Sequence, residues 1–152
     1  MPPGCSRRAW RSARHAATST GARALNNLGW VTHALGDLQR ARDFYRRGLE
    51  AATEIGLAEG QLWALFGIAA LESEAGDARA GARLLGRMKE LASRLGAGNE
   101  DQEDAIERQT LTRLEAALGP ERLASELAAG AALSLEDAID LALGRSDSAT
   151  PG

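Results

Sequence analysis

Two Gly-Asp pairs, Gly36-Asp37 and Gly76-Asp77, constrain the fold of this 152-residue chain more than any other feature. Each pair separates two stretches in which apolar residues recur every three or four positions, the spacing of an amphipathic helix. Glycine suits the left-handed conformation just past a helix end, and an aspartate side chain accepts hydrogen bonds from the first amides of the next helix. The sequence therefore predicts that the chain turns back on itself at each pair and forms helical hairpins.

The two hairpins share one register. Their Gly-Asp pairs lie 40 residues apart (76 − 36), and Gly119 marks a third turn 43 residues after Gly76 (119 − 76). Residues of similar kind then fall at matching positions: Leu65 for Leu25, Ile68-Ala69 for Leu28-Gly29, Gly81 for Ala41, and Leu85 for Tyr45. A repeat of this length predicts stacked units that bury their apolar faces against their neighbours.

The predicted fold class is all-α: stacked antiparallel helical hairpins that form an α-solenoid, with a C-terminal capping helix. The stretch from Leu62 to Leu71 is apolar nearly all round, so it should be the buried central helix of the stack. The last helix should cap the third hairpin. The expected helices span residues 22–35, 38–55, 59–75, 78–95, 101–118, 121–129 and 135–143.

The helical-repeat domain is predicted to cover residues 21–143, followed by a polar, disordered tail at 144–152. Residues 1–20 form a basic segment that is either poorly ordered or a partial helix ended at Gly21. This segment holds Arg7, Arg8, Arg11 and Arg14, and no acidic residue precedes Asp37. One interpretation is a basic arm that docks on an anionic partner. The other is a frayed terminus, or the end of a helix whose partner lies outside this chain.

The first hairpin resembles the tetratricopeptide (TPR) motif, which spaces a large residue, Leu-Gly, an aromatic, Ala and a second aromatic across two helices. The residues at those positions are Leu25, Leu28-Gly29, Thr32, Ala41 and Tyr45. Thr32 replaces the usual first aromatic, Thr53 stands where a proline normally closes the unit, and the period exceeds the usual ~34 residues. The resemblance implies a protein-binding scaffold and no particular reaction.

A second resemblance covers the end of the repeat region. Residues 118–143 read LGPERLASELAAGAALSLEDAIDLAL, similar to the close of the TPR-like region in large bacterial ATP-dependent regulators. These include LuxR-type transcriptional activators and AfsR-like or cyclase-linked signalling ATPases. The chain has no Gly-x-x-x-x-Gly-Lys-Ser/Thr phosphate loop, and no helix-turn-helix follows Leu143. What the resemblance implies is therefore the scaffold alone, as a C-terminal fragment or stand-alone relative of such a regulator.

Residues that could carry chemistry do not gather in the sequence. Cys5 is the only cysteine, and His15 and His33 have no carboxylate or thiol at ligand spacing. His33 is expected to be solvated or to cap its helix weakly. The sequence thus predicts no enzyme, cofactor or metal site. The net charge of −3 argues against nucleic-acid binding by the whole chain. Without a spanning segment or signal peptide, a cytoplasmic location is expected.

The candidate partner groove follows from repeat geometry, because stacked hairpins align their first helices along a concave face. Its predicted lining comprises Arg23, Asn26 and Trp30 from the first helix and Trp63, Phe66 and Ala70 from the third. Aromatic anchors suit a protein or peptide partner. The alternative is that Trp63 and Phe66 only pack between the hairpins.

Arg79, Arg83 and Arg87 are spaced by four and should form one stripe on the fourth helix. The stripe could meet an anionic partner, or it could be an ordinary solvated face. Together with the arginines of residues 7–14, it supports an alternative function as a nucleic-acid-binding adaptor. Such binding would be salt-dependent.

Self-association is the last expectation. No polar capping helix is predicted before Ala22, although solenoids normally cap their end repeats. The open face of the first hairpin should include Leu25, Trp30 and Tyr45, and an uncovered apolar face usually marks an interface. The chain is thus expected to form a dimer or a concentration-dependent aggregate.

Overall fold

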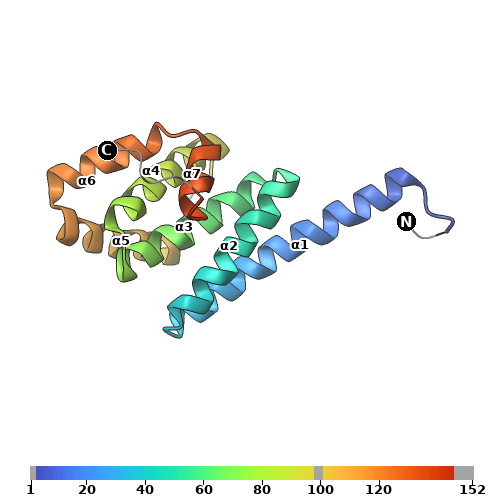
Figure 1. The fold of residues 1–152 in the computed structure, drawn as a ribbon, viewed down its shortest axis with the longest axis horizontal. Helices are drawn as coiled ribbons and strands as arrows, with labels where there is room; N and C mark the ends of the chain where they lie inside the picture. Colours follow the sequence, from blue (N-terminus) through green and yellow to red (C-terminus); the bar gives the residue numbers. More distant parts are fainter. Residues whose placement is uncertain (1–2, 98–100, 146–152) are drawn as a thin grey trace.

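The computed structural model describes residues 3–97 and 101–145, with the side chains of Asp101 and Gln102 left out. These residues form seven α-helices and, within the described ranges, no strand, so the predicted all-α fold is confirmed (Figure 1). The helices are α1 (Arg7–Ala34), α2 (Leu38–Ile55), α3 (Ala58–Ala75), α4 (Ala78–Leu95), α5 (Asp101–Leu118), α6 (Pro120–Ala131) and α7 (Leu135–Ala142). None of these helices is both long and apolar enough to cross a membrane.

The Gly-Asp turns are built much as the sequence predicts. The side chains of Asp37 and Asp77 cap α2 and α4 by accepting from the amides of Arg40 (3.2 Å) and Ala80 (3.0 Å). Gly36 adopts a left-handed φ of +86°. Gly76 does not, because its φ of −177° is extended, so the expectation of a left-handed glycine there is wrong. At this turn Glu72 Oε2 accepts from the amide of Asp77 instead (3.2 Å).

The hairpins α1–α2 and α3–α4 stack, and α3 lies at the centre of the stack, in contact with α1, α2, α4, α5 and α7. From Leu62 to Leu71 every residue of α3 is buried except Trp63, which is half-buried. The predicted central helix is therefore confirmed. Because α3 is apolar on all sides, it can serve as the shared core for helices on every flank.

The third unit departs from the predicted hairpin, since α6 packs chiefly against α4 rather than against its neighbour α5. Two glycines explain this pairing. A Cβ at Gly86 would overlap the backbone of Leu127, and a Cβ at Gly130 would overlap the backbone of Arg83. Their absence lets α4 and α6 approach with backbone nearly touching backbone.

Helix α7 packs against α4 and α3, and the carbonyl oxygen of Leu143 beyond its end accepts from Arg46 of α2. The helix therefore covers the second hairpin, and the expectation that it caps the third hairpin is wrong. Ser134 caps α7 by accepting from the amide of Asp137 (3.0 Å), and the helix begins at Leu135, the predicted position. Of the predicted tail at 144–152, residues from 146 on lie outside the described residues.

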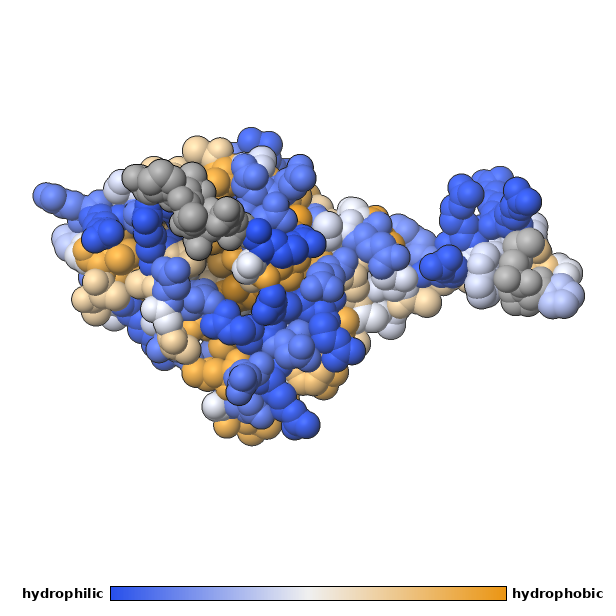
Figure 2. Space-filling view, viewed as in Figure 1, coloured by the Kyte–Doolittle hydropathy of each residue, from blue (hydrophilic) through white to orange (hydrophobic). Residues whose placement is uncertain are grey.

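The first helix is much longer than expected. It begins at Arg7, where Ser6 Oγ accepts from the amide of Ala9 (3.1 Å), and it continues through Gly21 without a break. The predicted start at residue 22 and the predicted break at Gly21 are both wrong. One glycine costs only about 1 kcal/mol inside a helix, and the flanking Ala and Arg residues favour helix. The N-terminal half of α1 projects from the rest of the molecule (Figure 1), and its outer end is strongly hydrophilic (Figure 2).

Candidate binding groove between α1, α3 and α5

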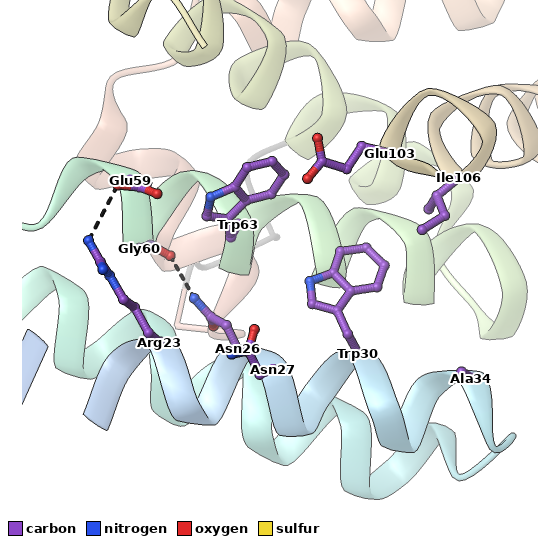
Figure 3. Close-up of a pocket in the computed structure, with 10 residues that line it drawn as sticks. All are labelled: Arg23, Asn26, Asn27, Trp30, Ala34, Glu59, Gly60, Trp63, Glu103 and Ile106. Carbon is purple, nitrogen blue, oxygen red and sulfur yellow. Dashed lines mark hydrogen bonds and ion pairs between the residues drawn. The ribbon is translucent and has the colours of Figure 1, made fainter. Parts of the chain in front are cut away.

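A cleft of about 500 Å³ lies between α1, α3 and the first turns of α5 (Figure 3). Helix α1 supplies one wall and α3 the opposite wall, while α5 closes the side. The lining residues are Arg23, Asn26, Asn27, Trp30, Ala34, Glu59, Gly60, Trp63, Glu103 and Ile106. Two indoles, two aliphatic side chains and several polar groups thus share one concave surface.

The indoles of Trp30 and Trp63 are half-buried, and the core holds both in place. Trp30 meets Tyr45 and Phe66 in edge-to-face geometry, with ring centroids 5.6 and 5.4 Å apart. Trp63 lies tilted against Phe66 at 6.4 Å. Such contacts fix ring orientation, so each indole packs inward while part of it lines the cleft.

The structure brings together four of the six residues predicted to line the groove: Arg23, Asn26, Trp30 and Trp63. Phe66 and Ala70 are buried in the core, so their predicted place in the lining is wrong. In α3 they lie on faces covered by neighbouring helices, and Phe66 supports the two indoles from behind.

Asn26 anchors the wall of the cleft more than it lines it. Its side chain is buried, and its amide donates to the carbonyl oxygen of Gly60 (3.1 Å), which joins α1 to α3. Its Oδ1 has no hydrogen-bond partner among the described residues and lies where a side chain on Gly48 would have to stand. A glycine at position 48 therefore leaves room for Asn26 between α1 and α2.

Sequence reasoning missed the polar residues Asn27 and Glu59 and the whole contribution of α5, which is Glu103 and Ile106. Glu59 pairs with Arg23 at the exposed end of the cleft, 3.6 Å apart. In Figure 3 the Glu103 carboxylate extends toward the space between the two indoles. The lining thus holds two carboxylates and one guanidinium, which makes it mildly acidic.

A hydrogen-bonded chain supports the cleft from behind Trp30. The Tyr45 hydroxyl lies 3.3 Å from His33 Nδ1, His33 Nε2 lies 3.2 Å from Glu74 Oε1, and Arg113 donates to the same oxygen at 2.7 Å. The His33 ring also stacks on Trp30. The expectation that His33 is solvated is therefore wrong, because its side chain bridges α1, α2 and α3.

These hydrogen-bonded side chains follow the order Tyr-His-Glu, but the Tyr45 hydroxyl is unsuited to nucleophilic attack. Tyr45 is fully buried, and burial, with a smaller contribution from the Glu74 carboxylate, raises the pKa of its hydroxyl well above the usual value. A nucleophile needs access to substrate and a proton that is easily removed. The cluster instead fixes the orientation of Trp30.

The arginine stripe is used inside the molecule. Arg79 Nε and Arg83 Nε lie 3.1 and 2.6 Å from the two carboxylate oxygens of Glu126 in α6, a buried residue. Arg87 is buried, and its Nε and Nη1 have no hydrogen-bond partner among the described residues. Two members of the stripe, Arg79 and Arg83, thus pair with α6 and the third is buried, so the stripe is not the free surface for an anionic partner that the sequence suggested.

The arginines of the N-terminal segment differ from that stripe. Arg7, Arg8, Arg11 and Arg14 are all exposed on the projecting half of α1. Three of them, with Trp10, border a shallow hollow that reaches Glu54 and Ile55 at the end of α2. This part of the chain therefore exposes positive charge on its surface.

Within the described residues, no three His, Cys, Asp or Glu side chains are placed to hold a metal ion. No protein-family model, curated protein or solved structure matches this chain. The resemblance to TPR repeats and to ATP-dependent regulators therefore stays a prediction from the sequence.

Proposed function

We propose that this chain is a protein-interaction scaffold that holds a segment of a partner protein in the cleft between α1, α3 and α5. The observation that carries the proposal is the pair of half-buried indoles, Trp30 and Trp63, lining one concave surface. Tryptophan is enriched among the residues that dominate binding energy at protein interfaces. Concave faces of stacked helical hairpins are the surfaces that such proteins use for binding.

Rigidity of the cleft supports this proposal. The Asn26–Gly60 hydrogen bond and the aromatic contacts behind Trp30 hold the two walls before any partner arrives. A preformed site loses little conformational entropy on binding, so more of the contact energy appears as affinity. The resemblance of residues 118–143 to the close of the TPR-like region in ATP-dependent regulators further favours a part of a bacterial regulator, in which the scaffold would serve signalling.

A selection from a library of displayed 12-residue peptides tests the proposal, with the enriched peptides then synthesised and titrated by fluorescence anisotropy. Trp63→Ala should raise the Kd at least about tenfold, the loss typical of a strong interface residue. Trp10→Ala is the matched control, because Trp10 lies on the projecting half of α1 and does not line the cleft. Equal affinities for wild type and Trp63→Ala would rule out the cleft as the binding site.

A second function, nucleic-acid binding through the N-terminal arm, is favoured by one observation: the four exposed arginines of residues 7–14. The Arg79 stripe no longer supports it, since two of its members pair with Glu126. Binding to duplex DNA that weakens steeply with salt and disappears when all four arginines are changed to alanine would establish this alternative.

A further inference from the structure

We infer that the partner segment inserts a lysine or arginine side chain between Trp30 and Trp63, with its charged end directed toward Glu103. This inference rests on the proposed function and adds the chemistry of the group recognised. It follows from three features of the cleft: the faces of two indoles, the carboxylate between them, and the place of Arg23.

The indoles provide the first argument. Tryptophan is the strongest aromatic partner for a cation, which is attracted to the electron-rich ring face within about 6 Å of its centroid. In Figure 3 the two rings line the cleft from opposite walls, α1 and α3, and leave the space between them open. A long aliphatic stem with a cationic end would contact both rings along its length.

Charge provides the second argument. Glu103 is half-buried beside the indoles, whereas Arg23 lies at the exposed end of the cleft and is already paired with Glu59. The cation-attracting part of the cleft is therefore its inner part. Glu103 makes an interaction of its own, but a carboxylate has about four acceptor sites and can receive further donors.

The Glu103 carboxylate and the indole ring faces also exclude other occupants. A segment with only apolar side chains would bury Glu103 further without giving it a donor, which is unfavourable for a charged group. An acidic or phosphorylated side chain would be repelled by the same carboxylate and would face the electron-rich ring surfaces. A basic side chain can donate to the Glu103 carboxylate and contact the indole faces at the same time, and a guanidinium can stack flat on an indole.

Nuclear magnetic resonance titration tests the inference on the full ¹⁵N-labelled chain. The probes are blocked pentapeptides Gly-Ser-Xaa-Ser-Gly in which Xaa is arginine, its neutral analogue citrulline, lysine, or the apolar analogue norleucine. The arginine and lysine peptides should shift the indole N–H signals of Trp30 and Trp63 and leave Trp10 unmoved. Citrulline and norleucine peptides should bind about 10-fold more weakly, given the usual strength of a partly desolvated cation–π contact.

Glu103→Gln should weaken the arginine peptide several-fold and reduce its preference over citrulline. Glu121→Gln is the matched control: it makes the same charge change at an exposed site on α6, outside the cleft, and should leave binding unchanged. Unaltered signals elsewhere in the spectrum would show that both variants remain folded.

Equal affinity for arginine and citrulline peptides would overturn the inference and leave the proposed function standing. Failure of the arginine and lysine peptides to move the Trp30 and Trp63 signals would overturn it as well. In that case the displayed-peptide selection decides separately whether the cleft binds any segment.

Discussion

The two Gly-Asp hairpins have matching sequences and different surroundings. In the second hairpin, Ile68 and Leu71 of α3 are buried, because α2 and α7 pack on this helix. The matching residues of the first hairpin, Leu28 and Val31 of α1, are 46% and 57% exposed. Equivalent apolar positions thus end in the core in one hairpin and on the surface in the other.

The difference teaches that position in the stack, more than local sequence, decides burial. A helix in a stacked-hairpin protein presents the same apolar faces wherever it occurs, and only its neighbours determine which of them are covered. Helix α3 has helices on every flank, whereas α1 has them on one side. Substitutions at matched positions should therefore have very different effects in the two hairpins.

The largest difference is expected for Ile68→Asp and Leu28→Asp, which make nearly the same change at matched positions. Ile68→Asp places a carboxylate in the closed core beside α3 and removes a buried aliphatic group, so it should lower the free energy of unfolding by at least about 4 kcal/mol. Leu28→Asp stays in contact with water in the single chain and should change the free energy of unfolding of the monomer by no more than about 1 kcal/mol. Urea denaturation measures both, and similar losses would contradict the comparison.

The next largest effect concerns glycines at a covered and an open helix surface. Gly86→Ala should destabilise by about 1–3 kcal/mol, because its Cβ would overlap the backbone of Leu127 and push α6 away from α4. Gly21→Ala should instead stabilise by up to about 1 kcal/mol, since no atom lies near that Cβ and alanine favours helix. Thermal unfolding should give shifts of opposite sign, and a shift of the same sign would refute the assigned packing.

A smaller effect, on the pH dependence of stability, is expected for the first hairpin alone. The counterpart of Tyr45 in the second hairpin is Leu85, which does not ionise. The folded state raises the pKa of Tyr45, so above pH 10 the unfolded chain loses this proton while the folded chain keeps it. The contribution of Tyr45 to the free energy of unfolding should therefore be complete below pH 10 and fall by about 1.4 kcal/mol per pH unit above it. Tyr45→Phe should lack this part of the alkaline slope.

Absorbance at 295 nm makes the tyrosine test specific, since the chain contains only one tyrosine. In the folded protein the tyrosinate signal should appear only as the chain unfolds. A titration near pH 10 with the fold intact would contradict the burial of its hydroxyl.

Local signals made much of the fold predictable. The caps at Asp37, Asp77 and Ser134 and the all-round apolar pattern of α3 depend on residues adjacent in sequence, and each was predictable for that reason. The start of α1 is not predictable from the same signals, because Gly21 resembles a helix end although a single glycine interrupts a helix only weakly.

Long-range packing was the part that sequence reasoning could not reach. Helix α6 pairs with α4 through Gly86 and Gly130, two glycines 44 positions apart (130 − 86), which carry no local signal for each other. The arginine stripe was misinterpreted for the same reason, since Glu126 lies 47 residues beyond Arg79. In the cleft, the first and third helices were placed correctly from the repeat, but Glu103 and Ile106 of α5 depended on how the third unit packs.

The last prediction concerns self-association through the open side of α1. Substitutions on this side should have the smallest effect on stability. Two of the three residues expected there do not form that face, because Tyr45 is fully buried and Trp30 lines the cleft. Leu28, Val31 and Leu35 do form it: they follow the three-four spacing of a helix-packing seam, and Leu35 is 79% exposed.

We propose that a second copy of the chain covers this seam, α1 against α1, since an apolar seam of this kind can be self-complementary across a twofold axis. The buried state of the matched residues Ile68 and Leu71 supports a helix as the covering element. Light scattering over a dilution series should show a dimer for the wild type and a monomer for Leu28→Gln, whose own unfolding energy should change by less than about 0.5 kcal/mol. Leu95→Gln is the matched control, because Leu95 is equally exposed, at 46%, but stands alone on α4. A wild type that stays monomeric at the highest concentration, or a control that dissociates as Leu28→Gln does, would mean that the seam of α1 is only a solvated surface.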